Sequence, residues 1–170
     1  MEEEFVKIEP EALADNVFEA IGTGWMLVTA GTRESYNTMT ASWGTMGVLW
    51  NKRICICYVR PSRHTYGFME KNGLFSLSFF EEKHRGILNY CGSHSGRDVD
   101  KARETGLRAV EPVNGAVTFE QARMALICRK IYYQDLDPSH FLADEIEDNY
   151  GGSDYHRFYI GEVQACLVRR

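Results

Sequence analysis

The sequence predicts a mainly β protein, a closed or nearly closed antiparallel barrel with a few short helices. Six or seven strand-length runs, apolar or alternating, follow one another along the chain and are separated by turn residues. Few stretches have helical spacing, and strands that follow one another without helices favour antiparallel pairing. Since 170 residues suit one domain with its own core, we expect a single domain over residues 1–170.

Each expected element rests on the spacing of its apolar residues and on the turn residues that bound it. Apolar residues at near-helical spacing predict an N-terminal helix over 11–21, which ends at Gly22. Runs between Gly, Asn and Pro residues predict strands at 25–30, 36–44, 53–59, 74–80, 116–120, 123–132 and 157–168. Helices are expected at 62–71, 82–90 and 98–105. For the last of these, Asp98 is the expected N-cap and Gly106 the C-terminal glycine. Both faces of the 53–59 run are apolar, which is typical of a strand deep in a barrel wall or a subunit interface.

Composition and the chain ends exclude several classes of protein. The net charge of −5 offers no polycationic face, so we expect no nucleic-acid partner. Acidic residues at 2–4 stand where a signal peptide would be basic, and no apolar run reaches the ~18 residues of a membrane span. We therefore expect no membrane segment and a cytoplasmic location. The five cysteines lack a C-x-x-C pair, and four of them, Cys55, Cys57, Cys128 and Cys166, are expected to be free and buried. Cys91 lies in a polar loop, where a structural role is favoured but stays open.

Several catalytic and metal-binding motifs are absent from the sequence. No G-x-G-x-x-G follows a strand, and neither a Walker loop nor an H-E-x-x-H motif occurs. The stretch from Gly92 to Gly96 has His94 at its centre, where a nucleophile elbow needs serine. The five histidines show no metal-ligand spacing. We therefore expect neither a Rossmann cofactor site, nor hydrolase chemistry, nor a bound metal.

The run at 36–44 has side chains of different character on its two faces. Alternation along a strand puts Met39, Ala41 and Trp43 on one face and Thr38, Thr40, Ser42 and Gly44 on the other. The first face is typical of a core. The second offers hydroxyl and backbone donors, which suit either a flat ligand or plain solvent.

Two further segments combine hydroxyls and cations at the expected start of a helix. Arg60, Ser62, Arg63 and Thr65 surround Pro61, and free amides at such a helix start bind phosphate. The stretch 93–101 again holds hydroxyls, a glycine and two cations. Solvated arginines are the alternative at each segment taken alone. The two segments and the hydroxyl-bearing strand together indicate a planar, phosphorylated ligand.

Five stretches, in one order, resemble a known family. These are N-T-M-T-A-S-W-G at 37–44, V-R-P-S-R-H-T-Y at 59–66, L-S-F-F at 77–80, N-Y-C-G-S-H-S-G-R-D-V-D-K at 89–101 and H-R-F-Y-I-G-E-V at 156–163. The chain resembles the flavin-reductase-like, FMN-binding split-barrel family, and within it the flavoredoxin branch. The resemblance implies an antiparallel split β-barrel homodimer with one FMN per subunit, bound near the dimer interface.

The resemblance also implies which residues bind FMN. Those matching the segment that lines the isoalloxazine ring are Asn37, Met39, Thr40, Ala41, Ser42 and Trp43. Those matching the phosphate turn are Arg60, Ser62 and Thr65. Phe79 and Phe80 match the strand beside the flavin, and His156 matches a position near the mouth of the site. Those matching the loop and helix start that close over the site are Ser95, Gly96, Arg97 and Lys101. His94 departs from the family, since a longer polar or basic residue often stands there.

The implied function is that of an FMN-binding oxidoreductase or electron carrier of flavoredoxin type, working with a redox partner protein. One alternative is an NAD(P)H:flavin reductase that supplies reduced flavin to a partner monooxygenase, with NAD(P)H as the electron donor. A second alternative is a flavin- or ligand-binding module without turnover. In each case the redox chemistry belongs to the flavin. We assign no residue as a catalytic acid or base.

Overall fold

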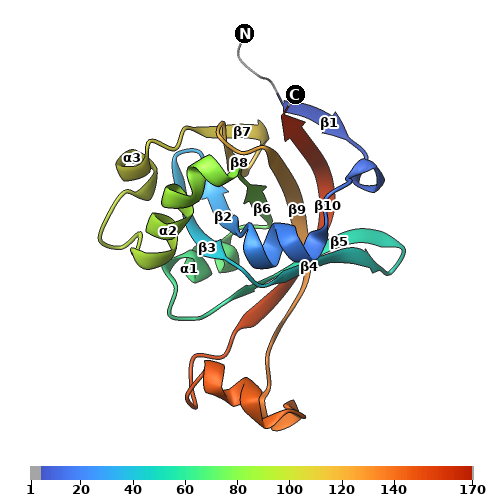
Figure 1. Ribbon diagram of the computed structural model, residues 1–170, viewed down its shortest axis with the longest axis vertical. Helices are drawn as coiled ribbons and strands as arrows, with labels where there is room; N and C mark the ends of the chain where they lie inside the picture. The colour runs from blue at the N-terminus through green and yellow to red at the C-terminus, as the bar shows by residue number, and fades with distance from the viewer. Residues whose placement is uncertain (1–4, 170) are drawn as a thin grey trace.

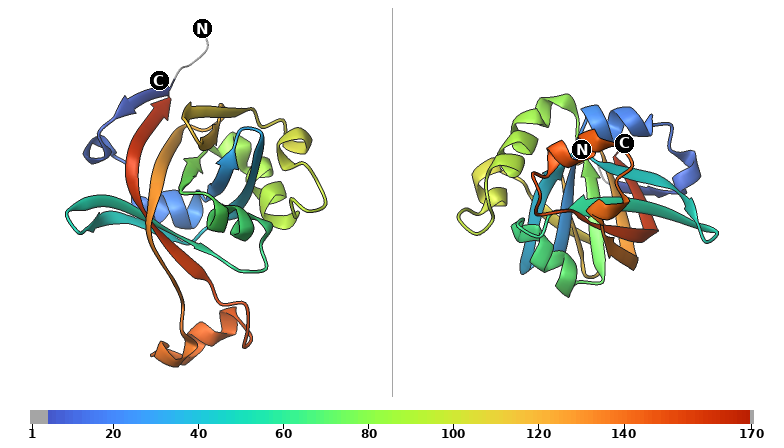
Figure 2. Two further views of the ribbon diagram at one scale, coloured as in Figure 1. Left: turned by 180° about the vertical axis from the view of Figure 1, so that it is seen from behind. Right: turned by 90° about the horizontal axis from the view of Figure 1, so that it is seen from below.

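The computed structural model describes residues 5–169. Its main element is an eight-stranded antiparallel sheet that curls into a barrel (Figure 1 and Figure 2). The strands of this sheet are β1 (Phe5–Ile8), β2 (Met26–Thr32), β3 (Ser35–Ala41), β4 (Gly44–Leu49), β5 (Lys52–Val59), β6 (Leu74–Phe79), β9 (Met124–Asp135) and β10 (Arg157–Arg169). Their order is β3-β2-β6-β9-β10-β5-β4, and β1 pairs with β10. A second, two-stranded sheet consists of β7 (Ala109–Val113) and β8 (Ala116–Phe119). These strands confirm the mainly β, antiparallel class.

Helices are few and short, as the sequence predicts. They are α1 (His64–Lys71), α2 (Arg85–Ser93) and α3 (Lys101–Thr105), with the shorter helical turns η1 (Pro10–Ala12), η2 (Glu19–Thr23), η3 (Glu82–His84), η4 (Pro138–His140) and η5 (Asp144–Asn149). Among the described residues, none of these helices is long and apolar enough to cross a membrane. The acidic residues at 2–4, on which the expectation about a leader rests, lie outside the described residues.

The barrel is split between β3 and β4. These strands are consecutive in the chain but lie at opposite edges of the sheet, and only Ser42 and Trp43 connect them. No backbone ladder joins the two edges within residues 5–169. The prediction of one strand over 36–44 is therefore wrong, because the chain leaves the first edge after Ala41 and joins the second at Gly44. We call this junction the seam.

Two helix predictions are wrong in their boundaries. The helix expected over 11–21 is reduced to η1 and a helical turn around η2, because the Asn16 side chain accepts the N–H groups of Phe18 and Glu19 and starts the helix there. The N-cap of α3 is Asp100 rather than Asp98, since the Asp100 carboxylate accepts the Arg103 N–H at 3.1 Å. Gly106 ends α3 in the left-handed conformation, as predicted.

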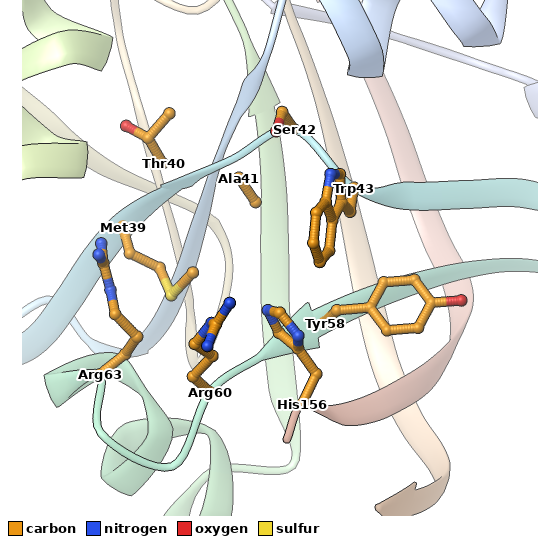
Figure 3. Close-up of a pocket in the computed structure, with 9 residues that line it drawn as sticks. All are labelled: Met39, Thr40, Ala41, Ser42, Trp43, Tyr58, Arg60, Arg63 and His156. Carbon is orange, nitrogen blue, oxygen red and sulfur yellow. The ribbon is translucent and has the colours of Figure 1, made fainter. Parts of the chain in front are cut away.

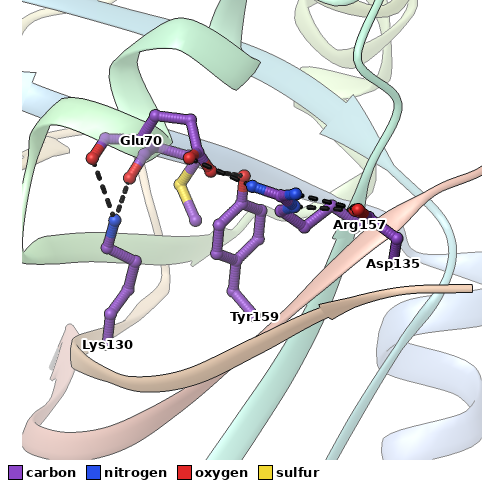
Figure 4. A network of polar contacts seen from close by, with 6 residues as sticks. Glu70, Lys130, Asp135, Arg157 and Tyr159 are labelled. Atoms are coloured by element: carbon purple, nitrogen blue, oxygen red, sulfur yellow. Dashed lines mark hydrogen bonds and ion pairs between the residues drawn. The ribbon is translucent and has the colours of Figure 1, made fainter.

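A polar network fixes α1 against the two longest strands (Figure 4). Arg157 of β10 binds both carboxylate oxygens of Asp135 on β9, at 2.7 and 2.8 Å, and reaches Glu70 of α1 at 3.1 Å. The buried Tyr159 hydroxyl donates to Glu70 at 2.6 Å, and Lys130 donates to backbone carbonyls at the end of α1. Burial, together with the bond to Glu70, raises the pKa of Tyr159. Because Arg157 binds carboxylates on both α1 and β9, and the buried Tyr159 also holds Glu70, the network connects α1 to both strands.

We expect Gly161→Ala to destabilise the barrel. Gly161 lies at an irregularity in the β9–β10 ladder, and an added Cβ would come within 2.5 Å of the Phe75 ring and 2.6 Å of the Cys128 Cβ. Both neighbours are buried, so the extra methyl overpacks the core, at a cost of about 1–3 kcal/mol in the free energy of unfolding. Thermal unfolding measures this as a lower melting temperature.

Gly47→Ala on β4 is the matched control, because no atom lies within 4 Å of its added Cβ. Its melting temperature should stay near that of the parent protein. Equal melting temperatures for the two variants would contradict the packing described around Gly161.

Candidate functional site

A pocket of about 220 Å³ opens at the seam (Figure 3). Its lining residues are Met39, Thr40, Ala41, Ser42, Trp43, Tyr58, Arg60, Arg63 and His156. They come from the end of β3, from β5 and the turn after it, and from the residue before β10. Seven of the residues that the resemblance assigns to FMN line this seam pocket. Tyr58 and Arg63 are not among the assigned residues, although Arg63 lies in the segment where the sequence predicts phosphate binding.

A second pocket of about 180 Å³ adjoins the seam pocket at Arg63, which lines both. We call it the cation pocket, because Arg63, Arg97 and Lys101 lie around it. It also contains Ser62 and Thr65 of the predicted phosphate turn and Ser95 and Gly96 of the predicted closing loop. Asn37, which the resemblance assigns to the ring, lies here instead of in the seam pocket. The start of α1 and the loop after α2 form its walls. Segments that are far apart in the sequence thus meet around two adjoining pockets.

Phe79 and Phe80 line neither pocket. Phe79 is 1% exposed and packs in the barrel core, since β6 lies between β2 and β9 in the middle of the sheet. Phe80 is 7% exposed and packs with Leu27 and Leu88 beneath α2. The alternating apolar pattern of this strand therefore reflects burial in the core.

The hydroxyl face of β3 is occupied by contacts within the protein. Thr38 and Thr29 share a hydrogen bond of 2.8 Å between their hydroxyls, and the Thr40 hydroxyl donates to the Leu88 carbonyl of α2 at 2.5 Å. Figure 3 shows Thr40 turned away from Arg60 and His156, while Met39 and Ala41 point to the side where these two lie. The idea that this row of hydroxyls faces a ligand is therefore wrong for these two hydroxyls, because that of Thr38 is bonded to β2 and that of Thr40 to α2.

Trp43 is exposed, although alternation along a single strand predicts that it lies in the core. Its side chain is 44% exposed, because β3 ends at Ala41 and the alternation stops there. The centroids of the indole and of the His156 ring are 5.1 Å apart, with 54° between the ring planes. The two rings form an aromatic wall of the seam pocket.

His156 is a neutral group in this wall at pH 7. It is 8% exposed, and its Nδ1 and the Tyr150 hydroxyl are 2.8 Å apart. Burial, and after it the positive charge of Arg60, lowers the pKa of His156 to about 4. The pocket therefore presents an uncharged imidazole beside an indole.

Arg63 has an unsatisfied donor where the two pockets meet. Its Nη1 donates to the Gly92 carbonyl at 3.1 Å, whereas its Nη2 is buried and has no hydrogen-bond partner among the described residues. Burial and the nearby Arg60 lower the pKa of this guanidinium. Because a buried unpaired donor is costly, an anion placed here would be stabilised. The sequence signal for Arg63 was its place in the motif 59–66.

Gly96 and Lys101 shape the cation pocket. An added Cβ at Gly96 would collide with the side chain of Asn37, whose carboxamide hydrogen-bonds the Thr65 hydroxyl over 2.7 Å. The buried Lys101 donates to the carbonyls of Thr38 at 2.9 Å and Cys91 at 2.8 Å. Burial lowers the pKa of Lys101 to about 8. Lys101 thus ties β3 to α2 and adds positive charge behind the pocket.

The chain between β9 and β10 contacts the turn that follows β5. This segment, which we call the excursion (residues 136–156), extends away from the barrel in Figure 1. The Asp154 carboxylate accepts the Ser62 N–H at 3.0 Å and the Ser62 hydroxyl at 2.5 Å. Arg60 donates to the Asn149 carbonyl at 2.7 Å. The excursion therefore engages donors that the sequence assigned to a phosphate.

The arrangement suits a planar molecule with an anionic tail. The seam pocket has aromatic and aliphatic walls, a neutral imidazole and two arginines, Arg60 and Arg63, which matches a planar ring system with polar atoms at its rim. The cation pocket places hydroxyls, a close-approach glycine and guanidinium donors within one small volume. No group of His, Cys, Asp or Glu in the described part of the chain could hold a metal ion.

Comparison with known proteins gives a family match over most of the chain. Residues 18–170 match the model of the flavin reductase like domain. No curated protein matches the chain. Among solved structures, an FMN-binding domain of a flavin reductase-like enzyme from Shewanella baltica is similar, with a TM-score of 0.71 and 17% identity over 99% of this chain and 78% of that one.

Two other solved structures share the fold. Flavoredoxin from Desulfovibrio vulgaris has a TM-score of 0.67 and 21% identity, and covers 95% of this chain and 76% of its own. The NADH:FAD oxidoreductase from Streptomyces globisporus has a TM-score of 0.65 and 19% identity, over 86% of this chain and 78% of that one. Because the identities are this low, the likeness to these structures shows a shared fold and no more.

We expect stability to fall in mild acid through His156. The folded-state pKa of about 4 lies below the ordinary 6.5, so the unfolded chain binds the proton first and stability is lost as the pH falls from 6.5 towards 4. Between pH 7 and pH 5 this amounts to about 2 kcal/mol. Denaturant unfolding at the two pH values measures it.

The control is His156→Gln, which keeps an acceptor for Tyr150 but does not titrate. Its free energy of unfolding should change less between the two pH values than that of the parent protein, by about the same 2 kcal/mol. The same pH dependence in both proteins would show that His156 is not held neutral by burial.

Proposed function

This chain belongs to the flavin reductase-like domain family, and we propose that it is a flavin-dependent oxidoreductase that binds FMN in the two joined pockets. The observation that carries the proposal is the meeting of the seam pocket and the cation pocket at Arg63. The first matches the isoalloxazine ring in its flat aromatic and aliphatic walls, with Arg60 and Arg63 at one side. The second matches the phosphate in its donors and charge.

The residues present fit FMN on two counts. The buried Nη2 of Arg63 has no partner in the described chain, and a phosphate oxygen would satisfy it. Gly96 lets the loop backbone approach Asn37 and His64 so closely that an added Cβ would collide with the Asn37 side chain, so the small pocket depends on glycine at this position. We propose that Arg63, Thr65 and the loop with Ser95, Gly96 and Arg97 hold the phosphate.

The residues at the seam would hold and orient the ring. Bound FMN supplies hydride or single-electron transfer. Ser42 and Trp43 lie between the two sheet edges without a ladder partner, so their backbone groups remain available to the polar rim of the ring. Trp43 and neutral His156 wall the pocket and exclude water, while Arg60 and Arg63 favour negative charge on the ring.

Within this class we propose an electron carrier of flavoredoxin type that works with a redox partner protein. The structural likeness to a flavoredoxin supports this role. The likeness to an NADH:FAD oxidoreductase supports the second candidate, an NAD(P)H:flavin reductase that supplies a monooxygenase. Under the first role, purified protein retains FMN and is reduced by a partner. Under the second, NADH or NADPH reduces the flavin directly.

We further propose a homodimer with FMN near the interface, in the cytosol. Large apolar side chains on and around β4 support a second copy there, since Val48 is 75% exposed and Trp50 is 56% exposed. All five cysteines are free thiols, the form kept in a reducing compartment.

The test of the proposed function is the visible spectrum of the purified protein after incubation with FMN and gel filtration. We expect the protein to retain flavin absorption and to lose it on reduction under anaerobic conditions. Bleaching by NAD(P)H supports the reductase, and bleaching only by a redox protein supports the electron carrier. A protein that cannot be loaded with FMN or FAD would refute flavin binding.

We expect Arg63→Gln and Thr65→Val each to weaken FMN binding by tenfold or more. Each substitution removes a donor to the phosphate, and a hydrogen bond to a charged group contributes about 1.5–3 kcal/mol. Titration of FMN fluorescence measures the dissociation constant. The control is Arg108→Gln, since Arg108 is exposed, pairs with Glu120 and lines neither pocket. Unchanged affinity in both site variants would place the phosphate elsewhere.

We expect Asp154 to be a positioning residue for the phosphate turn. It has a φ of +57°, which glycine and asparagine tolerate, and its carboxylate lies outside the cation pocket while holding Ser62. Asp154→Gly should weaken FMN binding severalfold, whereas Asp154→Asn, which keeps an acceptor for the Ser62 N–H, should stay within about twofold of the parent. Tighter binding by both variants would mean that the carboxylate competes with phosphate instead.

A further inference from the structure

A larger pocket of about 650 Å³ lies on the other side of the aromatic wall. We call it the outer pocket. It shares Ser42, Trp43 and Tyr58 with the seam pocket, so the two are separated by side chains that line both. The start of β4, the helical turn around η2 and the excursion enclose the rest. Figure 3 shows the Tyr58 ring extending away from Arg60 and the seam pocket.

The outer pocket has an apolar lining with a few hydroxyl groups. Its apolar part includes Val17, Ile21 and Met46, and its polar side chains are those of Ser42, Thr45 and the tyrosines Tyr58 and Tyr150. None of the side chains that the structure places around it carries a charge. A charged ligand would lose its hydration there without gaining a counter-ion, so the lining selects a neutral ligand.

The contrast with the neighbouring pockets is one of charge. Arg60, Arg63, Arg97 and Lys101 all line the seam or cation pockets, and none of them lines the outer pocket. A dinucleotide brings two or more phosphate charges, which have no partner among the outer pocket's side chains. A neutral aromatic compound needs only flat apolar contacts and one or two hydrogen bonds.

We propose that the outer pocket binds a neutral, planar aromatic compound of one or two fused rings, of the quinone class. Its volume lies within the ~300–1,000 Å³ that small-molecule sites occupy, and its hydroxyls can donate to carbonyl oxygens at the rim of such a ring. The binding itself is independent of the flavin. Its role as a redox-active molecule beside the flavin ring rests on the proposed function.

Gly22 offers a way to fill the outer pocket without disturbing the core. Gly22 lines the pocket, and nothing lies within 4 Å of a Cβ added to it. Gly22→Phe should therefore place a ring in the space meant for the ligand. The matched control is Gly86→Phe on α2, where an added Cβ also meets no atom within 4 Å and which lines neither this pocket nor the two beside it.

The probes are 1,4-naphthoquinone and its anionic 2-sulfonate, titrated calorimetrically into the full chain without flavin. We expect the neutral quinone to bind, Gly22→Phe to weaken it at least tenfold, and Gly86→Phe to leave it unchanged. We expect the sulfonate to bind the parent protein at least tenfold more weakly than the neutral quinone. Equal binding of the two probes, or quinone binding that Gly22→Phe leaves unchanged, would overturn the proposal.

Two added measurements distinguish a small-molecule site from a dimer contact and from the flavin site. If sedimentation shows that Gly22→Phe breaks a dimer and the parent protein binds no quinone, a second copy covers the outer pocket and the proposal is wrong. FMN titration of the same proteins separates this proposal from the proposed function. Quinone binding without FMN binding would refute only the flavin role, and FMN binding without quinone binding would refute only the outer pocket.

Discussion

The site depends on the seam, where two strands that follow each other in the chain occupy opposite edges of one sheet. Ser42 and Trp43 cross from β3 to β4 without joining a ladder, so the barrel stays open where it would otherwise close. The crossing is tightly packed at Gly44, where an added Cβ would lie 2.9 Å from the Met26 side chain and 3.0 Å from the Ile56 carbonyl. The seam and outer pockets lie on the two sides of this crossing.

The site also requires that α1 be held at both ends. Glu70, near its end, is fixed by Arg157 and Tyr159 from the barrel wall. The turn before its start is held by Asp154, which accepts two hydrogen bonds from Ser62. Arg63, between these anchors, keeps one unsatisfied donor at the boundary of two pockets. The contacts on both sides thus position a guanidinium whose own hydrogen bonding is incomplete.

The sequence predicts the strands well wherever alternation and turn residues coincide, and it fails where tertiary contacts decide. The pattern from 36 to 44 runs smoothly through Ser42 and Trp43, so nothing local reveals that the chain changes edges there. Thr40 has the residue type expected to face a ligand, but its hydroxyl is taken by Leu88, nearly fifty residues away. The resemblance names most of the residues that line the seam and cation pockets, but it does not name Arg63. What distinguishes Arg63 is a buried Nη2 without a hydrogen-bond partner among the described residues, which only the structure shows.

The decisive experiment for the flavin site is a crystal structure of the protein grown with FMN. We predict the isoalloxazine ring against residues 39–43 at the seam, with the phosphate within hydrogen-bond distance of Arg63 Nη2 and the Thr65 hydroxyl. FMN bound away from the seam, or a phosphate that leaves Arg63 unpaired, would contradict this placement.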